Sequence, residues 1–100
     1  MKSLTIIGKR WFQRSYGNTY FSGFALIDGK PCGVSIDKAY GYGNHYEHEV
    51  FDAVERAGLL PAPREHYERT GGAECPWMYC EKHGIAYQAI VSDVPREKDL

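Results

Sequence analysis

Four side chains that can bind a divalent metal ion lie close together in the middle of the chain. They are His45, His48, Glu49 and Asp52, spaced three or four residues apart. On a helix this spacing places two imidazoles and a carboxylate on one face. The HExxH pattern is absent, and a further ligand would have to come from another element. We therefore expect a solvated helix face here.

A second group of potential metal ligands, Cys75, Cys80 and His83, lies nearer the C-terminus. Two thiolates and an imidazole can bind zinc, with His66 or Cys32 as the fourth ligand. The spacing is loose, and free thiols packed against aromatic side chains have the same composition. We predict that this segment binds no metal and that the protein uses no cofactor. A zinc-stabilised structural domain is kept as a third hypothesis.

Motifs for catalysis are absent from the chain. It contains no GxSxG, no Walker loop and no GxGxxG. The loop YGYGN at residues 40–44 places glycines and backbone N–H groups where an anion could bind at a helix start. Such a loop more often only leads into the helix. We predict that the protein is not an enzyme.

Cations and aromatic rings alternate in the segment KRWFQR at residues 9–14. Unpaired bases can stack on such rings while the cations contact phosphates. Trp, Tyr and Arg are also the residues that contribute most of the affinity at protein interfaces. The expected partner-binding residues are Arg10, Trp11, Arg14, Tyr16, Tyr20, Tyr40 and Tyr42.

The charge of the chain favours a protein partner over nucleic acid. Twelve Lys and Arg against 13 Asp and Glu give a net charge of −1, which provides no overall attraction to nucleic acid or anionic lipid. No apolar run approaches the roughly 20 residues of a membrane span. Three cysteines without a secretion signal indicate reduced thiols. We expect a cytoplasmic protein with no membrane partner. A single-stranded nucleic-acid-binding module is the alternative function, and a homodimer stays open.

Three successive strands are predicted for the first part of the chain, at residues 4–13, 19–27 and 30–37. Asp28-Gly29 between the last two is a strong hairpin signal. Alternation assigns one face to the core, with Ala25 opposite Cys32, Gly23 opposite Val34, Phe21 opposite Ile36, and Ile6 and Phe12 added. The other face carries Ile7, Lys9, Trp11, Gln13, Tyr20, Ser22, Phe24, Leu26 and Ser35. This second face is too apolar for ordinary surface, so we expect it to be covered or to bind a partner.

A helix is predicted between Asn44, with Glu47 completing a capping box, and Gly58 as the left-handed terminator. Phe51 and Val54 are expected where this helix meets the sheet. A short helix is predicted for residues 64–69, and residues 75–84 have no readable periodicity. Residues 85–94 form a last strand that lies beside the sheet, across its aromatic face or against a partner chain.

These elements predict an α+β fold, in which a three-stranded antiparallel β-meander packs one helix and a C-terminal strand completes or extends the sheet. Residues 1–94 are expected to form a single domain, and residues 95–100 a flexible C-terminal tail.

Two motifs of the chain resemble a family of small uncharacterised proteins from tailed phages and prophages. They are TIIGKRWFQRSYGNTY at residues 5–20 and YGYG at residues 40–43, followed by a helix that ends in AGLL at residues 57–60. The resemblance covers about residues 4–60 and implies no catalytic residues. It implies a phage accessory protein that binds and blocks a host protein, such as a component of a CRISPR or restriction system, in the host cytoplasm. The surface for this binding would be the basic and aromatic residues named above.

Overall fold

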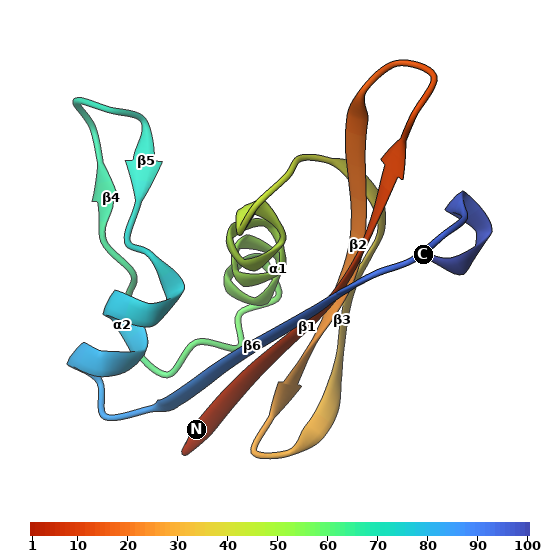
Figure 1. Cartoon of the computed structure of the whole chain (residues 1–100). Helices are drawn as coiled ribbons and strands as arrows, with labels where there is room; N and C mark the ends of the chain where they lie inside the picture. Colours follow the sequence, from red (N-terminus) through yellow and green to blue (C-terminus); the bar gives the residue numbers. More distant parts are fainter.

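A four-stranded sheet with helix α1 against one face forms the centre of the molecule (Figure 1). The computed structural model describes all 100 residues. The strand order is β3-β2-β1-β6; β1 to β3 form an antiparallel meander, and β6 pairs with β1 in parallel. The bounds are β1 Ser3–Gln13, β2 Asn18–Ile27, β3 Lys30–Tyr40, α1 His45–Arg56, α2 Pro76–Lys82 and β6 Ala86–Asp93. The predicted α+β fold is confirmed.

The turn between β2 and β3 forms at Asp28 and Gly29, as predicted. Both residues have positive φ angles, 52° and 78°, as a type I′ hairpin turn requires. The Asp28 carboxylate also accepts hydrogen bonds from the backbone N–H groups of Lys2 and Ser3, at 2.6 and 2.9 Å. These two bonds lower the pKa of Asp28 and attach the turn to the start of β1.

The pairing of β2 with β3 differs from the expected register. Ile36 lies opposite Gly23, and Phe21 lies opposite Ala39, so the two pairs expected for Gly23 and Phe21 are wrong. The cause is two irregularities in the pairing, one of which falls at Gly33, whose φ is 83°. The core-facing side chains of β3 nevertheless keep the predicted side of the sheet.

Helix α1 lies directly against the sheet because two glycines leave room for it. A Cβ atom at Gly8 would lie 2.6 Å from the Tyr46 ring, and one at Gly23 would lie 2.9 Å from Val50 Cγ2. The predicted apolar stripe of α1 is thereby buried. The core consists of Leu4, Ile6, Phe21, Ala25, Tyr46, Val50, Phe51, Val54, Tyr79, Cys80 and Ile85.

The C-terminal end of α1 agrees with the prediction, and the N-terminal end does not. Gly58 follows the helix with a φ of 73°, as expected of a left-handed terminator. The expected capping box is wrong, because Asn44 makes no side-chain cap hydrogen bond. The carboxylate of Glu47 instead accepts a hydrogen bond of 2.6 Å from the Tyr87 hydroxyl, which joins α1 to β6. Burial and the neighbouring Glu47 carboxylate raise the pKa of Tyr87.

The segment between α1 and β6 contains the largest departure from the predicted elements. Residues 64–69 form no helix; β4 (His66–Tyr67) and β5 (Gly72–Ala73) make a short hairpin instead. The side chain of Arg64 holds the hairpin closed, since its Nε donates to the Glu74 carbonyl at 2.8 Å. Helix α2 then starts at Pro76, which supplies the preset φ favoured at a first helical position.

The last strand takes the first of its three predicted positions, beside the sheet. It lies at the edge next to β1 and pairs with it from Ser3 and Ala86 to Arg10 and Asp93. The chain then ends in a short 3-10 helix, η1 (Glu97–Asp99). No helix of the protein has the length and apolar character needed to cross a membrane.

Candidate binding surface

The face of the sheet opposite α1, which we call the open face, is covered by neither α-helix, and only the short η1 lies on that side (Figure 1). Three aromatic side chains lie next to one another on it, on neighbouring strands: Trp11, Tyr20 and Tyr40. The rings of Trp11 and Tyr20 stack with centroids 5.9 Å apart, and Tyr40 meets Tyr20 edge-on at 5.7 Å. We call these three residues the aromatic ladder. Tyr40 is 57% exposed, and Trp11 and Tyr20 are partly exposed.

Residues 94–100, the C-terminal strap, turn back over the open face. The Lys38 ammonium on β3 pairs with the Glu97 carboxylate at 2.5 Å, and the Lys9 ammonium on β1 donates to the Asp99 carbonyl at 3.2 Å. Ser22 is only 8% exposed although it lies on the open face, because Leu100 lies beside it. Residues 95–100, which we expected to be a loose tail, therefore make specific contacts with two strands.

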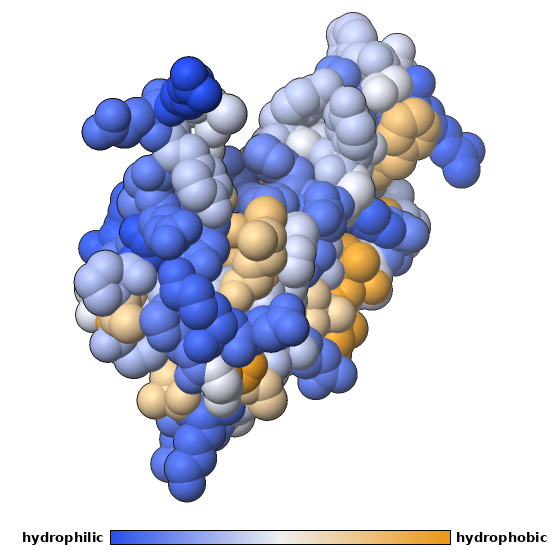
Figure 2. Space-filling view, turned by 90° about the vertical axis from the view of Figure 1, so that its left-hand side faces the viewer, coloured by the Kyte–Doolittle hydropathy of each residue, from blue (hydrophilic) through white to orange (hydrophobic).

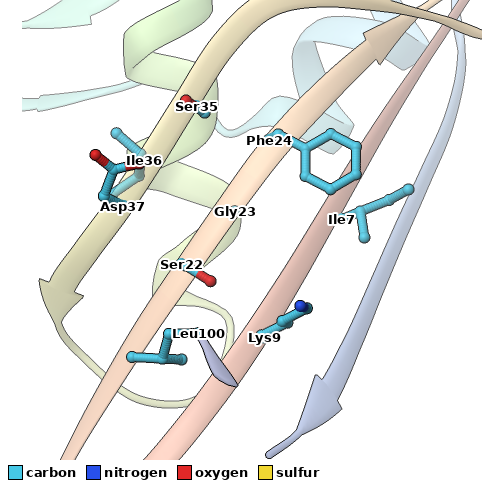
Figure 3. A pocket seen from close by; sticks show the side chains of 9 residues that line it. All are labelled: Ile7, Lys9, Ser22, Gly23, Phe24, Ser35, Ile36, Asp37 and Leu100. Carbon is cyan, nitrogen blue, oxygen red and sulfur yellow. The ribbon is translucent and has the colours of Figure 1, made fainter. Parts of the chain in front are cut away.

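A groove of about 410 Å³ lies on the open face beside the strap (Figure 3). The side chains of Phe24 and Ile7 project from β2 and β1 at one end of it, and Leu100 lies at the other end, near Ser22 and Lys9. Phe24 is 39% exposed, so apolar surface continues from the aromatic ladder past the strap. The residues that line the groove are Ile7, Lys9, Ser22, Gly23, Phe24, Ser35, Ile36, Asp37 and Leu100.

Most cations near the aromatic ladder already have partners within the protein. Lys38 pairs with Glu97 and also lies over the Tyr20 ring, with Nζ 4.8 Å from its centroid. Arg10 pairs with Asp93 at 3.2 Å and donates to a backbone carbonyl in the loop before α1. Arg14, at the β1–β2 turn, makes no salt bridge or side-chain hydrogen bond. One unpaired guanidinium therefore accompanies the aromatic rings.

The seven expected binding residues do not form one cluster. Alternation along β1 directs Arg10 to the α1 side of the sheet, away from Trp11. Arg14 and Tyr16 lie in the β1–β2 turn, which projects from the body of the molecule (Figure 1), and Tyr16 is 77% exposed. Tyr42 lies in the loop between β3 and α1 and is also largely exposed. The structure thus brings together the aromatic ladder and distributes the other four residues around it.

Phe12 is the one residue assigned to the wrong environment on β1. It was expected in the core but is 55% exposed. Residues 11–13 of β1 extend beyond the end of β6, which pairs only as far as Arg10, and Phe12 does not join the core.

The metal ligands considered on α1 serve other contacts. His45 pairs with Glu49 at 3.3 Å, and His48 meets the Trp77 ring edge-on. Asp52 instead accepts a hydrogen bond from Arg64. No group of three His, Cys, Asp or Glu side chains is arranged to hold a metal ion.

The cysteine segment forms α2 and is divided between core and surface. Cys80 is fully buried, and burial raises the pKa of its thiol to about 11. Cys75 is the residue before α2, and the His83 ring packs against Tyr79, 4.4 Å between centroids. The three side chains have separate environments, and the prediction that they bind no zinc stays a prediction.

A buried arginine that the sequence did not single out connects α1 to the β4–β5 hairpin. The Arg64 guanidinium lies 4.6 Å from the Phe51 ring centroid and donates to Asp52 and Glu55 at 2.6 and 3.1 Å. Burial raises the pKa of Glu55, but hydrogen bonds from His66 and Arg64 outweigh it, so the pKa is lowered overall. Two carboxylates three residues apart on one helix face were the available signal for a cation from another segment.

The side of the molecule that carries this hairpin and α2 is mostly hydrophilic (Figure 2). Exposed large hydrophobic side chains on this side include Trp77 and Met78 on α2, at 38% and 50%, and Tyr67 on β4, at 41%. The open face differs from this side in carrying adjoining aromatic rings and a groove.

Comparison with known proteins adds no relative to this description. No family model, no curated protein and no solved structure matches the chain. The resemblance of residues 4–60 to phage proteins stays a prediction, and the open face is the feature from which a function can be inferred.

Proposed function

We propose that the protein is a non-enzymatic binding protein whose open face docks on a protein partner. The observation that carries this proposal is the aromatic ladder. Trp11, Tyr20 and Tyr40 are rigid side chains held in contact across three strands, on a face that neither α1 nor α2 covers. Large rings with few rotatable bonds lose little entropy on binding and contribute much of the affinity of protein interfaces.

The charges around the aromatic ladder favour a protein surface over a nucleic acid. Arg10 lies on the α1 side of the sheet, where it pairs with Asp93. On the open face, Lys38 and Lys9 already bind Glu97 and the Asp99 carbonyl. A phosphate backbone would have to displace these contacts, and nucleic-acid affinity depends on cations that are free to neutralise phosphates. A partner with an apolar patch bordered by a carboxylate for Arg14 would require no such exchange.

The phage setting implied by the resemblance of residues 4–60 indicates which partner to look for. In that setting the protein is an accessory protein that blocks a host component, for example in a CRISPR or other defence system. Covering the component's own interaction site would block it without any chemical reaction.

The experiment is affinity capture from host lysate, followed by measurement of binding to the captured protein. Trp11→Ala and Tyr20→Ala are each expected to weaken binding by about 2 kcal/mol or more, which is about 30-fold in Kd. The matched control is Phe12→Ala, because Phe12 is an exposed aromatic residue on the same strand but points to the opposite face. It should leave affinity unchanged, and all three variants should remain folded.

Two results would contradict this proposal. If Trp11→Ala unfolds the protein, the ladder is part of the core and the interface is misplaced. If a single-stranded oligonucleotide binds and its affinity falls steeply with added salt, the open face is a nucleic-acid surface instead.

A further inference from the structure

The outer edge of β6 is an unpaired and regular strand edge. Strand β6 is last in the order β3-β2-β1-β6, so only one of its two edges has a partner strand. Backbone N–H and C=O groups along a free edge can pair with a further strand, and proteins usually obstruct such edges. The segment AYQAIVS, residues 86–92, has no proline, no charge and no register irregularity.

The direction of the backbone groups identifies which residues face outward. The N–H of Ala86 donates to the Lys2 carbonyl, and the N–H of Val94 donates to the Arg10 carbonyl. Because successive residues of a strand alternate, the even-numbered residues of β6 bond to β1 and the odd-numbered ones point outward. Tyr87, Ala89 and Val91 therefore present free donors and acceptors in a row.

The opposite edge of the sheet, on β3, is obstructed in several ways. Pro31 lacks a donor, Gly33 has a φ of 83°, and two register irregularities interrupt the strand. Lys38 and Asp37 add charges there, and the C-terminal strap binds Lys38. The contrast singles out β6 as the edge that remains open to pairing.

We propose that β6 pairs antiparallel with β6 of a second copy of this chain, which forms a twofold dimer with one continuous eight-stranded sheet. A second copy fits because the segment is neutral, so self-pairing brings no like charges together, and the charge next to it, Asp93, is held by Arg10. With Ala89 on the twofold axis, Tyr87 of each copy lies opposite Val91 of the other. Ile90, now 46% exposed, lies beside Gln88 of the other copy and loses exposure.

This dimer goes beyond the proposed function and does not depend on it. Antiparallel pairing about an axis perpendicular to the sheet leaves both open faces on the same side and both α1 helices on the other. The two aromatic ladders stay uncovered, so each dimer presents two binding surfaces to one side.

The test is the molar mass of the purified chain in solution, measured by light scattering over a range of micromolar concentrations. Wild type is expected at twice the monomer mass of 11.4 kDa. Ala89→Pro removes an outward N–H and no bond to β1, so it should give a folded monomer with an unchanged circular dichroism spectrum. Ser35→Lys, an added charge on the open face of β3, is the control and should stay dimeric.

Charge variants test the pairing even if Ala89→Pro fails to fold. Ile90→Lys and Ile90→Glu should each be monomeric alone because like charges approach across the axis, and a mixture of the two should recover the dimer mass. A wild type that is monomeric throughout would overturn the proposal. So would a dimer that persists in both Ile90 variants, or one that Trp11→Ala dissociates, since that result would place the contact on the open face.

Discussion

The two faces of the sheet are built from the same strands and differ in the side chains that the strands place on them. Toward α1 the strands place Gly8 and Gly23 under the helix, and the buried Phe21 ring packs edge-on against His45 of α1. Toward the open face they present Trp11, Tyr20 and Phe24. The two glycines let α1 approach the strands closely, whereas aromatic rings project from the open face. The faces therefore differ in that one is fitted to an α-helix and the other carries adjoining rings without one.

The largest expected effect is the loss of stability when an aromatic ring is removed from the α1 side of the sheet rather than from the open face. Phe51 on α1 is fully buried, and its ring contacts the Tyr79 ring and the Arg64 guanidinium. Phe51→Ala should therefore lower the free energy of unfolding by about 3–5 kcal/mol. Phe24→Ala removes the same ring from the open face, where Phe24 is partly exposed, and should cost about 1 kcal/mol. Urea titration of both variants measures the difference. Equal losses would mean that both faces are core.

Thiol reactivity should distinguish the buried Cys80 from the two partly exposed cysteines. A pKa of about 11, raised from 9.0, leaves Cys80 with about 100-fold less thiolate than an ordinary cysteine at neutral pH. Cys32 and Cys75 are partly exposed. Reaction with a disulfide reagent should modify two thiols in the folded protein and the third only after denaturant is added. Three thiols of equal rate would contradict the buried position of Cys80.

The close approach of α1 to the sheet predicts a moderate loss of stability when Gly8 is replaced. Gly8→Ala places a methyl group 2.6 Å from the Tyr46 ring, and overpacking of this kind should cost about 1–3 kcal/mol. Gly72→Ala in the β4–β5 hairpin is the control, because its nearest neighbour is the Thr70 side chain at 3.4 Å. Thermal melts of the two variants should differ by several degrees. Similar melts would show that α1 does not rest on Gly8.

The C-terminal strap should contribute least to stability. Lys38 and Glu97 are about half exposed, so Lys38→Ala should cost less than about 1 kcal/mol, and added salt should reduce even that difference. Denaturant titration at low and high salt measures both quantities. A loss of several kcal/mol would mean that the strap is part of the core and that the open face is closed.

Local signals account for the parts of the fold that the sequence predicted. The turn at Asp28 and Gly29 and the apolar stripe of α1 each depend on a few neighbouring residues, and both formed as expected. The hairpin at residues 66–73 depends on the side chain of Arg64 reaching Glu74 and Asp52 on α1, contacts that local propensity does not encode. Propensity alone therefore favoured a helix there, and tertiary contacts override it.

The candidate binding surface was predictable as a face of the sheet and less so as a set of residues. Alternation along β1 and β2 correctly brought Trp11 and Tyr20 together on one side. The same alternation excludes Arg10, which the basic and aromatic composition of the segment had included. The strap was not predictable because its contacts join Lys9 and Lys38 to residues about 60 or more positions away.

The two glycines under α1 also constrain how this sequence can diverge. A side chain larger than hydrogen at Gly8 becomes tolerable only if Tyr46 is exchanged for a smaller residue, and the same holds for Gly23 and Val50. Substitutions at each pair should therefore co-occur in distant relatives. Two such coupled pairs of positions, Gly8 with Tyr46 and Gly23 with Val50, are 38 and 27 positions apart in the chain. In an alignment of relatives they would be a fingerprint of this contact between helix and sheet. Such a fingerprint can survive after the rest of the sequence has changed beyond recognition.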